Sequence, residues 1–276
     1  MPLVSVGDIL ATHRAVAAFN VIQLEHAEAI VAGAQLAGLP VVLQISENTA
    51  KYHRGLAPLA LAARRIAESS TVGVALHLDH AEDEELVTEA LDLGMTSVMF
   101  DAAKLDYADN LRRTAAVAIA GRARGVWVEA ELGEVGGKDG AHAPGVKTDP
   151  ADATAFVTAT GVDGLAVAVG SSHAMTTRTA TLDFDLIARL RDAVRVPLVL
   201  HGSSGVSDAD IVRAIDAGMR KVNIATHLNT LFTGAVRAEL DRAPGLVDPR
   251  AYLGPARDAV ADEVARLVTL ITGRTA

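Results

Sequence analysis

Residues 72 to 80 read VGVALHLDH, a short apolar run that ends in His77, Asp79 and His80. Similar runs, rich in Val, Leu and Ala, recur along the chain and alternate with longer amphipathic segments. This alternation is typical of strands and helices that build a parallel sheet. The polar residues at the end of the run indicate that chemistry is concentrated where the strands end.

The alternation predicts eight strands. They are Val16–Val21, Val41–Ser46, Val72–His77, Ser97–Asp101, Gly125–Glu131, Gly164–Val169, Val196–His201 and Lys221–Ala225. Predicted helices between them are Glu25–Ala37, Ala57–Glu68, Glu82–Leu93, Asp109–Arg124 and Ser207–Ala217, the last with Ser207 as N-cap. We expect an α/β fold: one eight-stranded β/α barrel domain over residues 1–276, with extra helices near the C-terminus at Pro255–Ile271. A doubly wound open sheet is the rival, but the first strand is followed by no glycine-rich loop.

Composition narrows the function classes. The 276 residues suit one barrel, and the net charge of -9 disfavours binding to nucleic acid or anionic membranes. Cysteine is absent, so a metal would need His, Asp or Glu as ligands. The sequence shows no membrane-spanning run and no signal peptide, from which we expect a cytoplasmic protein.

Catalytic groups of β/α barrels lie at the carboxyl ends of the strands. We therefore expect His80, His173 and His201, each at or just after a different strand, to bind a catalytic Zn²⁺ or another divalent transition metal. Any one of them alone is more often a hydrogen-bonded structural residue. His77 is expected to point into the barrel as such a residue.

Nearby carboxylates have two interpretations each. Asp79 is either a general acid/base or a partner that orients a ligand imidazole, and we favour catalysis. Asp101 and Glu131 either form a second metal position or are buried hydrogen-bond partners.

Two glycine-rich stretches follow strands. Gly202–Ser207 offers backbone amides and hydroxyls for a phosphate, although such residues also form ordinary turns. Leu132–Gly145 is either a lid that brings Asp139 to the site or a surface loop.

Five motifs resemble those of the class II fructose-bisphosphate and tagatose-bisphosphate aldolase family, and the similarity covers nearly the whole chain. They are VALHLDHA at 74–81, VEAELGEVGG at 128–137, VGSSH at 169–173, LHGSSGV at 200–206 and KVNIAT at 221–226. The resemblance implies metal-dependent aldol cleavage or condensation that gives dihydroxyacetone phosphate and an aldehyde. It also implies a homodimer or homotetramer, with a monovalent cation as a further candidate cofactor.

The resemblance also implies roles for residues. Asp79, Asn223 and Asp139 would be catalytic, and His80, His173 and His201 would bind the metal. Substrate contacts would come from Asn20, Ser46, Ala174, Gly202, Ser204 and Thr226.

Departures from the family pattern bear on the substrate. Asp139 stands where the family has Glu, and Ala174 stands where it has Gly. Ala225 favours the tagatose-type branch, while His227 and Asn229 replace an acidic and basic pair whose basic residue serves a second phosphate in the family. Alternatives are therefore an aldolase of the deoxy-phospho-ketogluconate type with a non-phosphorylated aldehyde, a zinc-dependent hydrolase or isomerase, and a noncatalytic relative.

Overall fold

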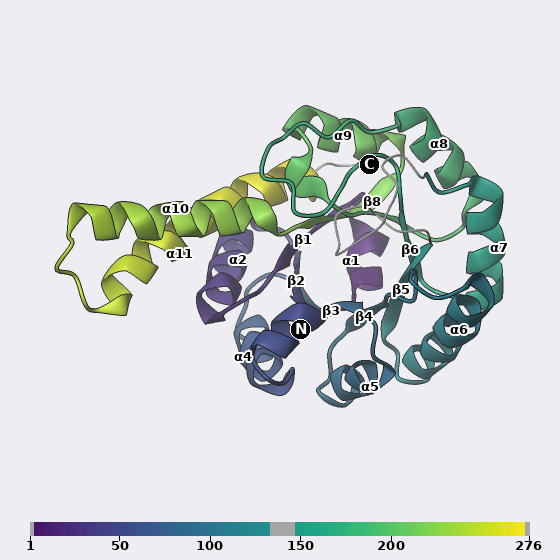
Figure 1. Ribbon diagram of the computed structural model, residues 1–276, viewed down its shortest axis with the longest axis horizontal. Helices are drawn as coiled ribbons and strands as arrows, with labels where there is room; N and C mark the ends of the chain where they lie inside the picture. The colour runs from purple at the N-terminus through teal and green to yellow at the C-terminus, as the bar shows by residue number, and fades with distance from the viewer. Residues whose placement is uncertain (1–2, 133–146, 274–276) are drawn as a thin grey trace.

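Parallel strands form the centre of the molecule (Figure 1). The computed structural model describes residues 3–132 and 147–273, and within these ranges eight strands close into a barrel in chain order. The strands are β1 Val16–Asn20, β2 Val41–Ser46, β3 Val74–Ala81, β4 Ser97–Phe100, β5 Trp127–Leu132, β6 Gly164–Val167, β7 Leu198–Leu200 and β8 Met219–Ile224. The predicted α/β barrel is therefore confirmed.

Helices surround the barrel (Figure 1). They are α1 Val6–Thr12, α2 Leu24–Ala37, α3 Glu47–Tyr52, α4 Ala57–Glu68, α5 Glu84–Asp92, α6 Tyr107–Ala123, α7 Pro150–Thr160, α8 Phe184–Ala193, α9 Asp208–Ala217, α10 Thr226–Arg242 and α11 Pro249–Ile271, with a 3₁₀ turn η1 at Ser203–Gly205. Ser207 is the N-cap of α9, as predicted, because its side chain accepts a hydrogen bond from the Asp210 amide. No helix in the described ranges is long and apolar enough to cross a membrane.

Alternation along each strand separates two cores. In β1, Ala17 and Phe19 point outward and join the large core between barrel and helices, whereas Val16 and Ala18 point inward. The inward residues near the strand starts are apolar and pack against α1. Toward the carboxyl ends the inward positions become polar, as at Asn20 in β1. One end of the barrel interior is thus a core and the other a site.

Strand β3 differs from its prediction at both ends. It runs to Ala81 rather than ending at His77, so Asp79 and His80 lie within it. The pairing register with β4 shifts between Leu78 and Ala81, and His80 takes a left-handed φ of 50°. This bulge breaks the strict alternation and sets the direction of the His80 side chain.

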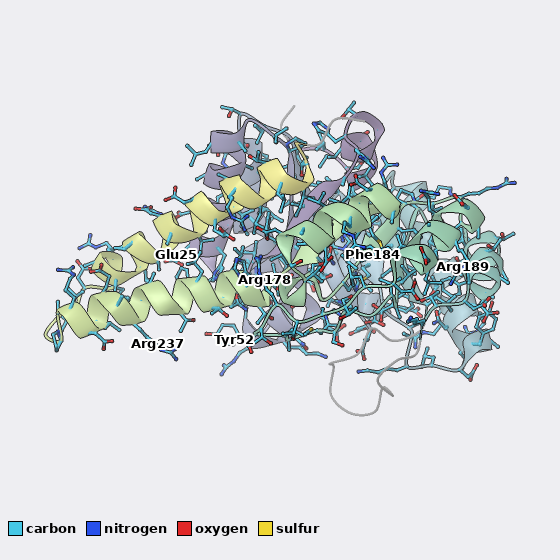
Figure 2. The ribbon with its side chains drawn as sticks, turned by 90° about the horizontal axis from the view of Figure 1, so that it is seen from above. Glu25, Tyr52, Arg178, Phe184, Arg189 and Arg237 are labelled. Carbon is cyan, nitrogen blue, oxygen red and sulfur yellow. The ribbon has the colours of Figure 1, made fainter. Side chains whose placement is uncertain are left out.

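Helices α10 and α11 project from one side of the barrel as an antiparallel pair (Figures 1 and 2). The predicted helix Pro255–Ile271 begins earlier, at Pro249, and continues through Pro255. Near the barrel, α11 packs closely on α2 at Gly33, where an added Cβ would lie 2.4 Å from the Ala261 carbonyl oxygen. A side chain at position 33 would therefore separate the two helices.

Candidate active site

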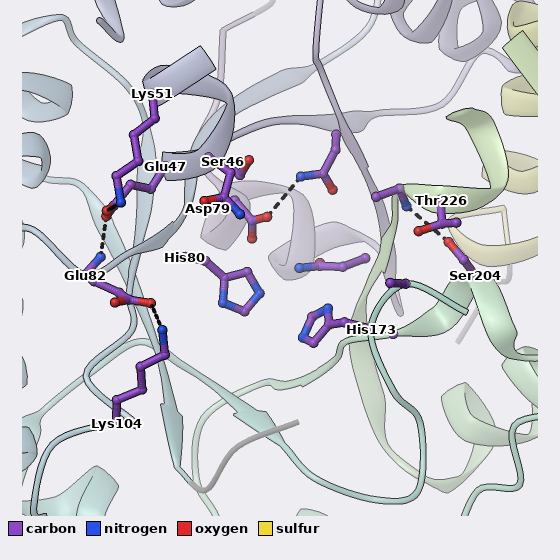
Figure 3. A pocket seen from close by; sticks show the side chains of 16 residues that line it. Ser46, Glu47, Lys51, Asp79, His80, Glu82, Lys104, His173, Ser204 and Thr226 are labelled. Atoms are coloured by element: carbon purple, nitrogen blue, oxygen red, sulfur yellow. Dashed lines mark hydrogen bonds and ion pairs between the residues drawn. The ribbon is translucent and has the colours of Figure 1, made fainter. Parts of the chain in front are cut away.

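A cavity of about 500 Å³ lies at the carboxyl ends of the strands (Figure 3). Ten of the predicted site residues line it: Asn20, Ser46, Asp79, His80, His173, Ala174, Gly202, Ser204, Asn223 and Thr226. These residues come from opposite sides of the barrel and from segments far apart in the chain. The structure brings them together, while their individual roles stay predictions.

Three histidines and one glutamate form the centre of the site. His80, His173, His201 and Glu131 each offer a ligand atom, and these atoms all lie within 4.8 Å of one another. The ring centroid of His80 lies 5.0 Å from that of His173 and 4.7 Å from that of His201. Imidazole nitrogens and a carboxylate oxygen are donors that Zn²⁺ accepts in proteins. The residues present therefore fit a divalent metal.

Carboxylates orient the imidazoles of this cluster. Asp101 Oδ2 lies 2.7 Å from Nδ1 of His80, which leaves Nε2 of that ring for a metal. His201 contacts Glu131 through Nδ1 at 3.1 Å and Glu129 through Nε2 at 3.0 Å. Such an outer carboxylate fixes the tautomer and direction of a ligating histidine, as Asp101 does for His80. Both ring nitrogens of His201 contact carboxylates, so a metal bound by His201 would take the place of one of these contacts. Of the two interpretations of Asp101, its contact supports the hydrogen-bond partner, whereas Glu131 lies within the cluster itself.

A buried ion pair lies beneath the cluster. The Lys221 ammonium is 2.8 Å from Glu129 Oε2 and 3.4 Å from His77 Nε2, and all three side chains are fully buried. His77 also meets the Ser97 hydroxyl at 2.9 Å, as expected for a satisfied interior histidine. Lys221 was not predicted from the sequence as a site residue. Its position two residues before Asn223 in β8 was the available signal, because both side chains then point into the barrel.

Charges in this region shift one another's protonation. Burial opposes a charge on His201, but hydrogen bonds to Glu129 and Glu131 raise its pKa to about 9. Burial would raise the pKa of Glu129, but Lys221 and His201 lower it to about 2. Burial and the charge of Lys221 lower the pKa of His77 to about 3. The interior is therefore a set of mutually compensating charges.

Asp79 is held at the edge of the cavity by a chain of amides. Asn20 Nδ2 donates to Asp79 Oδ2 at 3.0 Å, and Gln44 Nε2 donates to Asn20 Oδ1 at 3.0 Å. Asp79 Oδ1 has no hydrogen-bond partner among the described residues. Burial opposes its ionisation, but the charges of His80, His77 and Lys221 outweigh this and lower the pKa of Asp79. Asp79 is therefore an oriented carboxylate with one oxygen available to a ligand.

A tight turn after β7 forms another wall of the cavity. Gly202 has a φ of 67°, and a Cβ there would lie 2.5 Å from the Ser172 carbonyl oxygen, so only glycine fits. Ser204 Oγ accepts hydrogen bonds from the amides of Ala225 and His227 at 3.3 and 3.1 Å. The hydroxyl thereby joins this turn to the start of α10.

Two further predicted substrate-binding residues, Ala174 and Ser46, have backbone roles as well. Ala174 takes a left-handed φ of 58°, the conformation that suits the glycine of the family pattern. Ser46 is the N-cap of α3, and its Oγ accepts a hydrogen bond from the Thr49 amide at 3.2 Å. Asp139 and most of the predicted lid lie outside the described residues.

Comparison with known proteins identifies relatives over nearly the full chain. The family model described as fructose-bisphosphate aldolase class-II matches residues 6–274. Fructose-bisphosphate aldolase of Geobacillus stearothermophilus is 41% identical over 250 residues, covering 89% of this chain and 87% of the relative. Its Staphylococcus epidermidis counterpart is 38% identical over 272 residues, covering 96% and 95%. The crystal structure of the YdjI aldolase from Escherichia coli K12 superposes with a TM-score of 0.85 at 34% identity, covering 98% of this chain and 97% of that one.

Proposed function

Because the chain belongs to the class II fructose-bisphosphate aldolase family, a group of metal-dependent aldehyde-lyases, we propose that it cleaves or forms the carbon–carbon bond between dihydroxyacetone phosphate and an aldehyde. One observation carries this proposal. Asp79 and two histidines of the cluster, His80 and His173, line the same cavity as Asn223 and the Gly202 turn. The proposal assigns to that one cavity a metal position, an oriented carboxylate and a phosphate-binding wall.

The metal-binding residues we propose are His80, His173 and His201. When bound there, a divalent cation supplies Lewis-acid stabilisation of negative charge on the substrate. Zn²⁺ is our first choice, as in class II aldolases, with other divalent transition metals as alternatives. We do not assign a position for the predicted monovalent cation.

Asp79 is the proposed proton carrier at the new bond. In cleavage, its oxygen Oδ1, which has no hydrogen-bond partner among the described residues, takes the proton from the hydroxyl next to the bond that breaks. In condensation, it returns that proton to the aldehyde oxygen. Asn20 keeps the other oxygen, Oδ2, fixed during both steps.

Asn223 and the phosphate-binding wall hold the three-carbon unit. The Asn223 amide donates to the oxygen on which enediolate charge develops. The Gly202 turn, Ser204, Thr226 and the Ala174 amide bind the phosphate of dihydroxyacetone phosphate. We further propose that Asp139 moves the carbon-bound proton.

An aldolase that uses a non-phosphorylated aldehyde is the second candidate, and one observation favours it. Among the described residues, no arginine lines the cavity, and the two lysines that do, Lys51 and Lys104, are each paired with a glutamate. Arg178 pairs with Asp208 on the surface, and Arg257 pairs with Glu28 at 3.1 Å. The sugar, the tagatose-type branch, the oligomer and the cellular location stay predictions.

Exchange of the carbon-bound proton of dihydroxyacetone phosphate into deuterated water tests the proposal without an aldehyde. We expect exchange by the metal-loaded protein that a chelator abolishes and Zn²⁺ restores. Absence of exchange by fully loaded protein would contradict enediolate chemistry and favour a hydrolase, an isomerase or a noncatalytic protein.

An Asp79→Asn variant separates the two proton transfers. The new side chain keeps the shape and an oxygen for Asn20, but it cannot carry the proton of the aldehyde oxygen. We expect normal metal content and cleavage slowed at least about 100-fold, with a smaller effect on proton exchange. Equal loss of exchange and cleavage would show that Asp79 does not act at the aldehyde.

A further inference from the structure

A second cavity, of about 400 Å³, lies at the end of the barrel opposite the candidate active site. Its walls come from the segment before β1, the loop between α8 and β7, and the loop between α9 and β8, all at the amino ends of strands. Four arginines line this cavity, which we call the arginine pocket: Arg14, Arg191, Arg195 and Arg220. The chain as a whole has a net charge of -9, so the pocket is a local excess of positive charge.

Two of the arginines contact the C-terminal end of α9. Arg191 Nη1 donates to the Ala217 carbonyl at 3.1 Å, and Arg14 Nη1 lies 3.0 Å from Asp216 Oδ1. Guanidinium groups stabilise the negative end of a helix, so both side chains have a structural role. Arg191 also pairs with Asp192 at 2.8 Å. The charges of these two arginines are therefore each matched by a carboxylate.

The other two arginines have no carboxylate partner among the described residues. Arg220 is half-buried, and its Nη2 donates to the carbonyls of Leu10 and His13 at 2.8 and 3.3 Å, while its Nε has no hydrogen-bond partner. Arg195 is exposed, and its side chain makes no hydrogen bond or ion pair with another described residue. Burial and the charge of Arg14 lower the pKa of Arg220. Because carbonyl groups are neutral, the pocket keeps two uncompensated positive charges.

Apolar residues form the rest of the pocket wall. Val196 and Pro197, just before β7, are partly exposed there, and Ile215 of α9 lies nearby. Gly218 has a φ of 141°, and a Cβ there would lie 2.7 Å from the Cβ of Arg191. Glycine at 218 therefore lets the Arg191 side chain lie across the turn into β8. A ligand in the pocket meets guanidinium groups and an apolar surface together.

This combination favours one class of ligand. A guanidinium presents two parallel N–H donors that match the oxygens of a phosphate, and charge-assisted bonds of this kind are strong. Among the described residues, Asp216 is the only carboxylate that lines the pocket, and it is paired with Arg14. The acidic surface of the whole chain disfavours a nucleic acid as the source of the phosphate.

We propose that the arginine pocket binds a small organic phosphate. Arg195 and Arg220 supply the uncompensated charge for the phosphate group, and Arg14 and Arg191 add donors beside it. The less polar part of the ligand lies against Val196 and Pro197. The site is separate from the proposed site for dihydroxyacetone phosphate, and the inference holds whether or not the chain is an aldolase.

Calorimetric titration of the metal-loaded protein tests the proposal with three probes: phenyl phosphate, inorganic phosphate and phenol. Phenyl phosphate has both a phosphate and an apolar ring, whereas each of the other two has only one of these parts. We expect phenyl phosphate to bind at least about 10-fold more tightly than either. Equal binding of inorganic phosphate or of phenol would overturn the assignment to an organic phosphate.

Variants then locate the binding, since the candidate active site is a second place for a phosphate. Arg14→Met/Arg195→Met should weaken phenyl phosphate binding by about 10-fold or more. Arg195→Met alone breaks no contact between described residues, so the fold is not at risk, and it should weaken binding about 5-fold. Proton exchange of dihydroxyacetone phosphate should stay unchanged in both variants.

Arg65→Met/Arg112→Met is the matched control for the double variant. Both side chains are exposed, at 86% and 71%, each is paired with a carboxylate three residues away, and neither lines the pocket. The control loses the same two charges and should bind phenyl phosphate as the native protein does. Native affinity in the Arg14/Arg195 variant, or an equal loss in the control, would overturn the arginine pocket as the binding site.

Discussion

Charges inside the barrel and charges on its surface are held in different ways. Lys221 and Glu129 are completely buried, and their neighbours are other charged or ionisable side chains. Arg112 and Asp109 on α6 pair at 3.1 Å with side chains 71% and 52% exposed. On the surface, water can solvate a charge that has lost its partner. In the interior, a charge that has lost its partner stays unsolvated. The interior charges therefore depend on one another, and the surface charges do not.

The largest expected effect comes from removing His201 at the centre of the interior set. We expect His201→Ala to lower Zn²⁺ affinity by more than the roughly 100-fold typical of an outer partner, and to abolish proton exchange. Metal analysis after dialysis and the exchange assay measure both. His13→Ala, at the opposite end of the barrel, should change neither. Retention of stoichiometric zinc by the His201 variant would remove this residue from the ligand set.

Breaking the buried ion pair between Lys221 and Glu129 is expected to lower the stability of the folded protein, even when no metal is bound. In metal-free protein, Lys221→Met should lower the free energy of unfolding by about 3–5 kcal/mol, because Glu129 is left as an uncompensated buried charge. Urea denaturation measures the change. Adding Glu129→Gln to the variant should recover part of the loss. A loss below about 1 kcal/mol would mean that interior and surface pairs are equivalent.

His26 provides a buried ionisable group outside the site. It is 4% exposed, stacks on Phe232 with ring centroids 4.7 Å apart, and finds no hydrogen bond for either ring nitrogen among the described residues. Burial lowers its pKa from 6.5 to about 4. Above pH 6.5 the ring is neutral in both folded and unfolded protein. As pH falls from 6.5 toward 4, the unfolded chain binds a proton that the folded chain does not, so stability decreases.

The expected loss over that pH interval is about 2–3 kcal/mol. Urea denaturation at a series of pH values should show it. His26→Leu should reduce the slope while retaining the contact with Phe232. An unchanged slope in this variant would assign the acid sensitivity to other groups.

The smallest effect is expected on the surface. Arg112→Ala should change the free energy of unfolding by less than about 1 kcal/mol, because exposed ion pairs contribute little and salt screens them. The same urea experiment at low and high salt measures it. A loss comparable to that of Lys221→Met would remove the distinction between the two regions.

The sequence predicted the barrel because its signal is local. Apolar runs such as Val41–Ser46 are each short enough to be strands, and the helices between them have amphipathic spacing. Three strand-end histidines were also predictable as a group, since a closed barrel brings strand ends together. Metal binding by His80, His173 and His201 stays a prediction until it is measured.

The features that could not be predicted from the sequence depend on contacts between segments that are far apart in the chain. Lys221 meets Glu129 because β8 and β5 face each other through the interior, which no pattern within one strand reveals. Lys51 reaches the cavity from α3, a helix of only six residues, which is too short for its periodicity to predict it. The extension of β3 to Ala81 depends on the left-handed turn at His80. Each of these features is tertiary in origin.

Closure of the sheet by β1 against β8 has a consequence for how the chain folds. Ala18 of β1 pairs with Asn223 of β8. The Ala17 amide donates a hydrogen bond to Thr272 Oγ1, which is 255 positions away in the sequence. Contacts of such high sequence separation form late, because a long loop must close before they contribute. During synthesis, β1 therefore lacks its second partner until β8, Met219–Ile224, has been made. An incomplete chain exposes the free edges of β1 and of its last strand, and these edges are where aggregation would begin.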